Sequence, residues 1–366
     1  PELAIEYYKK ALEARPDERR AMLALEELYQ TGEDPQELLE VLRKRAEFAE
    51  GDDERKELLF READLLRDRL EDKGGAISVL ESVLEVDVDP RATSQLEALY
   101  TSEGRFLDLV SLYERMLESS KVHGADAAAL RVKIAKTARG KLDDAPRAFD
   151  ELVEALDADP GHAAAVAELE AILAQPVPEA DTEAGAALEE RARAAEMLEP
   201  IYLKQADWEK VRATLEARLD ASQDPDERRD ILKRLSTLHE DQLGDYTAAL
   251  GATARLLHEE VSDRTTWSEL ERLARVASAE RRLADIYAAE LAKIDSDDPD
   301  TAELCKRTGE IYADLGDSKA ALTWYRRAHA FSPDSDDLFE AIDALLVKES
   351  LHQERVDLMR AALDYR

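Results

Sequence analysis

The pattern of apolar and polar residues is helical along the whole chain. Apolar side chains recur at the spacing of one helix face, and short breaks rich in Gly, Pro or Asp separate such segments. No segment alternates apolar and polar residues as a half-buried strand does, so we expect no β-sheet. We expect helices over residues 1–14, 18–29, 35–49, 53–70, 76–86, 91–101, 106–119, 125–141, 145–158, 162–174, 183–204, 208–221, 225–243, 246–259, 264–276, 279–294, 336–348 and 351–365, with two more inside 302–335.

The stretch 302–335 sets the register for the rest. It reads AELCKRTGEIYADLGDSKAALTWYRRAHAFSPDS, which is 34 residues long. Numbered from Ala302, it has small residues on two helices, aromatic residues beside them, a glycine that can take positive φ after the first helix and a proline after the second. These residues are Gly309 (position 8), Tyr312 (11), Gly316 (15), Ala321 (20), Tyr325 (24), Ala328 (27) and Pro333 (32).

This stretch resembles a tetratricopeptide repeat (TPR), whose 34-residue pattern places such residues at these positions. It departs at position 4, where Cys305 replaces the usual Trp, and at position 7, where Thr308 replaces the usual Leu. The resemblance implies two antiparallel helices, A and B, that approach closely at Gly309 and Ala321.

The same register recurs along the chain. Position-20 residues follow one another at steps of 33 to 39 residues, except for one step of 63, and small residues alternate with larger ones, giving a true period of 72 residues. Such self-similarity is typical of a solenoid. With the resemblance, it predicts an all-α fold: a right-handed α–α superhelix of about ten TPR-like hairpins. The position-20 residues are Ala4, Leu38, Ala76, Leu109, Ala148, Val211, Ala249, Leu283, Ala321 and Arg355.

The step of 63 indicates one inserted helix. We expect an N-terminal run of hairpins over 1–173, a loop and inserted helix over 174–204, and a C-terminal run over 205–366, in one continuous solenoid. For helices A to stay on one face of the solenoid, the loop should run back along the helix predicted over residues 162–174. The helix from Glu183 would then start at the same end as that helix. Pro200 should kink this helix.

Both ends of the chain carry apolar residues without a covering helix in this sequence. The first helix reads as a helix B without its helix A and carries Leu3, Ile5 and Tyr7. Because a solenoid needs polar terminal units, we expect a fragment of a longer array that can self-associate end to end.

Composition narrows the function classes. The chain has 50 basic and 84 acidic residues, a net charge of −34, which argues against nucleic acid and anionic membranes as partners. The chain contains no run of 18 apolar residues, so we expect no transmembrane helix. The single cysteine, Cys305, excludes an internal disulfide. Abundant Arg and the absence of Asn resemble the usage of a high-GC bacterial genome, with adaptation to high salt as a second contributor. We expect a cytoplasmic protein, with the periplasm as the alternative.

No pattern of catalytic or metal-binding residues is evident. The six histidines lie in different repeats without metal-ligand spacing. The segment from Asp295 to Asp300 resembles a calcium loop only faintly, because it lacks the Gly and the Glu that such loops need, and helix capping explains its aspartates better. We expect no enzyme, no cofactor and no metal.

TPR arrays bind segments of other proteins, mostly along the concave groove lined by helices A. The resemblance therefore implies a non-enzymatic protein–protein interaction scaffold. A peptide- or ligand-responsive regulatory module, and a TPR appendage of an enzyme outside this sequence, are the alternatives. Repeats that grip a C-terminal carboxylate use Lys and Asn at positions 5 and 9, where this chain has Lys306 and Glu310. That mode cannot operate here as it does in those repeats.

In TPR folds, positions 2, 5, 9, 12 and 13 of helix A line the groove. Half of the residues read from these positions are basic, so we expect a groove less acidic than the rest of the surface. It would accept a segment bearing carboxylates, with Arg193, Arg272 and Arg275 as donors; a solvated face with incidental arginines is the alternative. The candidate binding residues are Arg20, Arg91, Arg193, Glu196, Arg272, Arg275, Lys306 and Glu310.

Overall fold

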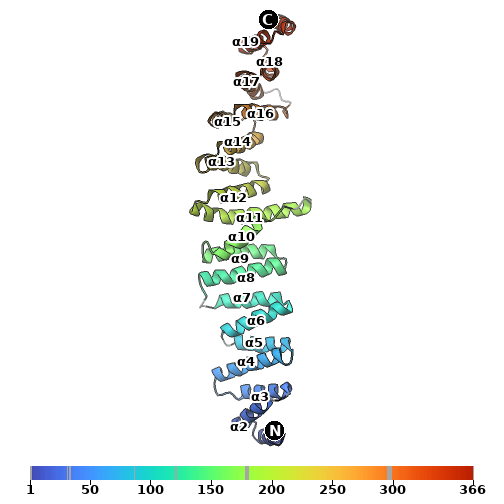
Figure 1. Ribbon diagram of the computed structural model, residues 1–366, viewed down its shortest axis with the longest axis vertical. Coiled ribbons are helices and arrows are strands. Elements are labelled where there is room, and N and C mark those ends of the chain that lie inside the picture. The colour runs from blue at the N-terminus through green and yellow to red at the C-terminus, as the bar shows by residue number, and fades with distance from the viewer. Residues whose placement is uncertain are drawn as a thin grey trace. The chain divides into compact units, whose positions relative to one another are not determined.

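The computed structural model describes residues 2–365 except 31, 33, 86, 120–121, 178–180 and 295–298. Over these residues it has twenty α-helices and no strand, which confirms the all-α prediction (Figure 1). None of these helices is both long and apolar enough to cross a membrane. The chain divides into two compact units, Pro1–Glu168 and Leu169–Arg366, and the division falls inside α10 (Ala163–Leu173).

The first unit contains a single helix followed by four helix pairs. Each pair joins a helix A to a helix B through a short turn, and the pairs follow one another in chain order (Figure 1). The elements are α1 (Glu2–Ala14), α2 (Arg19–Gln30), α3 (Pro35–Glu47), α4 (Asp52–Asp68), α5 (Lys73–Leu84), α6 (Pro90–Glu103), α7 (Phe106–Glu118), α8 (Ala125–Lys141) and α9 (Ala145–Ala158).

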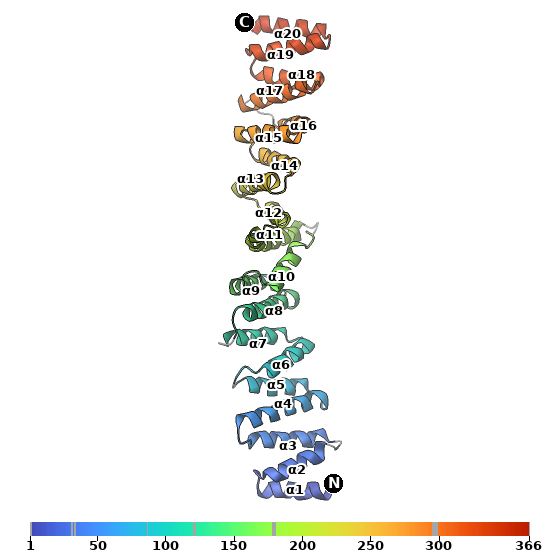
Figure 2. The same ribbon diagram turned by 60° about the vertical axis from the view of Figure 1, so that its left-hand side comes forward.

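The second unit contains five helix pairs, of which the last two are seen lengthwise in Figure 2. The first helix of these pairs, α11, covers the residues of the predicted inserted helix and contains Pro200. Part of the preceding loop, residues 178–180, lies outside the described residues, so the return of that loop stays a prediction. The elements are α11 (Asp181–Gln205), α12 (Trp208–Ala221), α13 (Pro225–Asp241), α14 (Tyr246–Glu259), α15 (Arg264–Ala277), α16 (Glu280–Leu291), α17 (Pro299–Asp314), α18 (Ser318–Phe331), α19 (Asp336–Lys348) and α20 (His352–Tyr365).

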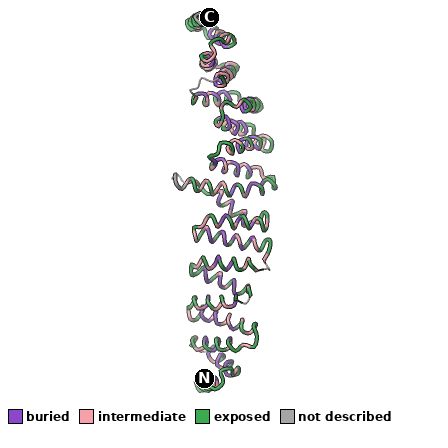
Figure 3. Tube along the Cα trace, turned by 180° about the vertical axis from the view of Figure 1, so that it is seen from behind, coloured by how far each residue is buried: buried purple, intermediate pink, exposed green. Residues whose placement is uncertain are grey.

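Burial confirms the predicted close approach of helices A and B in the reference repeat. Buried residues gather on the helix faces that meet neighbouring helices within each unit (Figure 3). Ala321 is fully buried, and a Cβ atom added to Gly309 would lie 2.6 Å from Cδ1 of Tyr325. The small residues therefore sit where helices A and B approach, and Tyr325 fills the space beside them. The other small position-20 residues of the full pairs are equally buried: Ala76, Ala148 and Ala249.

The turn between helices A and B has a repeated geometry. Gly316 has a φ of +79°, as predicted, and the amide of the next residue, Asp317, donates to the carbonyl of Tyr312 at 2.8 Å. Asp317 then caps helix B by accepting from the amide of Ala320. In three other hairpins the corresponding Asp bonds to a carbonyl six residues earlier instead of five: Asp72 to Leu66, Asp144 to Ala138 and Asp245 to His239.

This longer turn shifts helix A by one residue relative to position 20. In the pair α13/α14, the helix A residue beside Ala249 is Ser236, whose Oγ lies 2.8 Å from Oγ1 of Thr253. Counting back from Ala249 by the reference spacing would have given Thr237. The register of helix A therefore has to be corrected wherever the turn is longer.

Every second helix A has an acidic residue at position 8, where the reference repeat has Gly309. The first four of these acids bind a base on the next helix A, 35 or 36 residues later. These inter-repeat ion pairs mark the two-hairpin period directly in the structure. They are Glu26–Arg61, Glu97–Lys133, Glu199–Arg234 and Glu271–Arg307.

Candidate functional site

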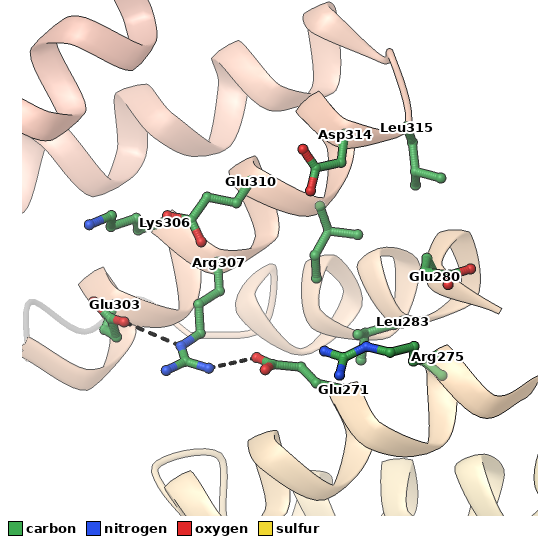
Figure 4. Close-up of a pocket in the computed structure, with 12 residues that line it drawn as sticks. Glu271, Arg275, Glu280, Leu283, Glu303, Lys306, Arg307, Glu310, Asp314 and Leu315 are labelled. Atoms are coloured by element: carbon green, nitrogen blue, oxygen red, sulfur yellow. Dashed lines mark hydrogen bonds and ion pairs between the residues drawn. The ribbon is translucent and has the colours of Figure 1, made fainter. Parts of the chain in front are cut away.

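A cavity of about 710 Å³ opens between α15, α16 and α17 in the second unit (Figure 4). Two of these helices, α15 and α17, are helices A, so the cavity lies on the face that the resemblance assigns to binding. We call it the α15–α17 pocket. Its lining residues are Glu271, Ala274, Arg275, Glu280, Leu283, Glu303, Lys306, Arg307, Glu310, Ile311, Asp314 and Leu315.

The charged residues of α17 reach the pocket because of their spacing. Glu303, Lys306, Glu310 and Asp314 are positions 2, 5, 9 and 13 of the reference repeat, and residues three or four apart share one helix face. Lys306 and Glu310 are two of the candidates predicted from the sequence. Glu303 and Asp314 were missed, although the same offsets point to them.

One wall of the pocket is an inter-repeat ion pair. Arg307 donates from Nη1 to Oε1 of Glu271 at 2.6 Å and from Nε to Oε1 of Glu303 at 3.2 Å (Figure 4). Its guanidinium also lies 5.6 Å from the ring centroid of buried Trp267. Arg307 is thus neutralised and held in place, so it is a structural part of the wall.

The other charged groups of the pocket are less engaged. Arg275 makes no ion pair with any described residue, and Nζ of Lys306 lies 3.8 Å from Oδ2 of Asp337. Glu280, Glu310 and Asp314 likewise form no ion pair within the described part of the chain. With five carboxylates and three bases in its lining, the pocket is acidic, unlike the groove expected from the sequence.

Glu310 is at the rim of this pocket, and its environment opposes ionisation. Desolvation raises the pKa of Glu310 above 4.5. The negative charges of Glu303 and Asp314 raise this pKa as well, whereas the positive charges of Lys306 and Arg307 lower it. An acid with a raised native pKa destabilises the fold as the pH rises above the pKa of the unfolded state, and the loss is complete above the native pKa.

We therefore expect Glu310→Gln to raise the denaturation midpoint at pH 7. The gain should disappear below about pH 4, where Glu310 is protonated in both the native and the unfolded state. Urea denaturation of both proteins at the two pH values measures this. An equal gain at both pH values would show that the effect is not electrostatic.

The structure does not gather all the predicted site residues in this pocket. Arg275, Lys306 and Glu310 line it. Arg272 instead forms charge-assisted bonds with Glu240 and Glu269, which raise its pKa further. Of the three arginines expected to act together, only Arg275 lines the α15–α17 pocket.

The remaining candidates lie elsewhere. On α6 of the first unit, Arg91 donates to Glu57 at 3.0 Å and lies 4.1 Å from the ring centroid of Phe60. Arg20 is exposed on α2 of the same unit, while Arg193 and Glu196 are exposed on α11. They are surface residues of other helices A, and none of them lines the α15–α17 pocket.

Metal and thiol chemistry find no support in the described residues. No group of three or more His, Cys, Asp or Glu within them could hold a metal ion. Residues 295–298 of the faint calcium-loop resemblance lie outside the described part. Cys305 is buried, and desolvation raises the pKa of its thiol to about 11, so it is not a thiolate at neutral pH.

Solved structures to which the chain is similar at low identity include the following three, whereas no curated protein matches the chain. A tetratricopeptide repeat protein from Parabacteroides merdae ATCC 43184 is 13% identical over 80% of this chain and 98% of that chain, with a TM-score of 0.23. The P58(IPK) TPR domain is 15% identical over 85% and 93%, with a TM-score of 0.23. The structure of Naa15/Naa10 bound to HypK-THB is 12% identical over 98% and 60%, with a TM-score of 0.34.

A sequence model described as a tetratricopeptide repeat matches residues 1–18. This segment runs through α1 and contains Ala4 and Pro16, which the predicted register places at positions 20 and 32. The matched segment is similar to a tetratricopeptide repeat, and the helical hairpins with their recurring register support a tetratricopeptide repeat protein.

Proposed function

We propose that this chain is a non-enzymatic scaffold that binds a segment of another protein along the helix A face of its second unit. Tetratricopeptide repeats generally mediate interactions between proteins and are generally not catalytic. The observation that carries the proposal is the position of the α15–α17 pocket, whose α17 side is built from positions 2, 5, 9 and 13 of helix A.

The chemistry of the pocket suits a polypeptide. Leu283 is buried in its lining, Ile311 is half-buried, and Leu315 is 42% exposed at its edge. Apolar side chains among charged ones match the usual composition of a protein interface, in which apolar side chains are desolvated and polar groups set the orientation. Arg275 and the carboxylates of Glu280 and Asp314 supply the polar rim (Figure 4).

The test is a selection of random peptides of about twelve residues, which span roughly 40 Å when extended, on the immobilised full chain. Selected peptides should bind the free chain, and Leu315→Glu should weaken binding about tenfold because it places a charge at the edge of the apolar lining.

Leu107→Glu is the matched control, since Leu107 is 66% exposed on α7, a helix B of the other unit. It should leave binding unchanged. If no peptide is enriched, or if both substitutions weaken binding equally, the scaffold function at this face is refuted.

A further inference from the structure

A second cavity lies on the helix A face of the second unit, between α11, α12 and α13. Its volume is about 330 Å³, and we call it the α11–α13 pocket. It is lined by Leu203, Val211, Leu215, Lys233, Arg234, Thr237, Leu238, Asp241 and Gln242.

The two pockets are copies of one site, one two-hairpin period apart. Leu203 and Val211 precede Arg275 and Leu283 by 72 residues, and the α13 residues precede their α17 counterparts by 73. The α13 residues correspond to the α17 residues as Lys233 to Lys306, Arg234 to Arg307, Thr237 to Glu310, Leu238 to Ile311, Asp241 to Asp314 and Gln242 to Leu315.

Both pockets have the same fixed wall. Arg234 binds Glu199 as Arg307 binds Glu271, so in each pocket the arginine is neutralised by the position-8 acid of the preceding helix A. Glu199 is buried and also accepts from Nη1 of Arg218 at 3.0 Å. A buried carboxylate that is paired with two guanidinium groups is held within the fold. The recurring wall gives both pockets the same frame, and the remaining residues determine what each accepts.

The remaining residues differ in charge. In the α11–α13 pocket, Leu203 replaces Arg275 and Thr237 replaces Glu310. Apart from the fixed wall, this leaves Lys233 and Asp241, whose charges cancel, beside a Leu203 side chain that is 43% exposed. The α11–α13 pocket therefore suits an uncharged apolar side chain.

In the α15–α17 pocket, acidic groups outnumber basic ones. Once Arg307 is neutralised by Glu271 and Glu303, the carboxylates of Glu280, Glu310 and Asp314 face only Arg275 and Lys306. The apolar residues Leu283 and Ile311 line the same space. A long side chain that packs an apolar stem against this lining and places a cation at the acidic rim is complementary to both features.

From this comparison we propose that one segment of a partner protein occupies both pockets, with an apolar side chain in the α11–α13 pocket and a Lys or Arg side chain in the α15–α17 pocket. The proposal rests on the scaffold function proposed above and specifies the partner of that face. It replaces the acidic segment expected from the sequence with a basic one, because Arg275 is outnumbered by carboxylates in its own pocket.

Peptides selected on the full chain test the charge requirement. We expect enriched sequences to combine an apolar residue with Lys or Arg. In fluorescence anisotropy titrations, the double substitution Glu310→Gln and Asp314→Asn should weaken the binding of such a peptide about tenfold. The same peptide with Lys changed to Gln should bind both proteins equally. The control is the double substitution Glu40→Gln and Glu47→Gln, which removes two exposed acids of α3 and changes the net charge equally. It should not change the binding of the peptide.

The α11–α13 pocket is tested by loss and by gain of binding. Leu203→Gln should weaken the binding of the selected peptide and the binding of its Lys-to-Gln version by the same factor. Thr237→Glu, which gives this pocket the acid of its counterpart, should strengthen binding of a peptide in which the apolar residue is changed to Lys. A gain of binding cannot arise from misfolding.

The outcomes separate the two proposals. Enrichment of acidic peptides that depend on Arg275 would overturn this inference and leave the scaffold function intact. Basic peptides unaffected by both the Glu310/Asp314 and the Leu203 substitutions would also overturn it. A selection that enriches nothing would refute the scaffold function itself.

Discussion

Replacing Glu26 by Gln should lower the free energy of unfolding by roughly 3–5 kcal/mol. Glu26 is 6% exposed on α2, and its carboxylate binds Arg45 of α3 and Arg61 of α4. The side chain of Arg45 is itself largely buried. Neutralising the carboxylate leaves this guanidinium only Glu54, whose Oε1 lies 3.3 Å from its Nη2, and a buried charge that loses a partner is strongly destabilising. Urea denaturation followed by circular dichroism measures the loss.

Two further proteins make this result interpretable. Glu40→Gln on exposed α3 surface should change the stability by no more than about 0.5 kcal/mol. Glu26→Leu combined with Arg45→Met should recover much of the loss, because an apolar pair can replace a buried ion pair. If Glu26→Gln were as stable as Glu40→Gln, the ion pairs of Glu26 with Arg45 and Arg61 would not stabilise the stack.

Enlarging Ala321 to Leu should cost roughly 1–3 kcal/mol, because the helices cross there without free space. Ala321 is fully buried on α18, and the ring of Tyr325 already fills the gap beside Gly309. Thermal and chemical denaturation of the variant report the loss. Glu340→Gln on exposed surface of α19 is the control and should stay within about 0.5 kcal/mol of the wild type. Equal stability of the two variants would contradict the register at this crossing.

The two-hairpin period links stability to the proposed binding face. Alternate helices A carry either a small residue such as Gly309 or an acid such as Glu271 at position 8. The small residue lets helices A and B approach within a hairpin, whereas the acid binds a base of the next hairpin. Since Arg307 is that base and also lines the α15–α17 pocket, the same contact holds neighbouring hairpins together and forms the pocket wall.

The sequence by itself predicted the helices, the hairpins and the positions of close approach. These features depend on neighbours within one repeat: helical spacing of apolar residues, small residues at positions 8 and 20, and turn residues such as Gly316. The same local spacing singled out Lys306 and Glu310, which line the α15–α17 pocket together because positions 5 and 9 share one side of a helix.

Only the tertiary structure decided the turn lengths and the charge of the site. Glu71, Asp143 and Ala206 adopt positive φ without being glycine, so no residue type marked these turns. The difference of one residue in turn length displaced the counted helix A positions, as at Ser236. Counting bases along helices A suggested a groove less acidic than the rest of the surface, yet one of those bases, Arg272, is neutralised by Glu269 and by Glu240 of another helix. Which charges remain available depends on contacts between hairpins, and these form only when the repeats stack.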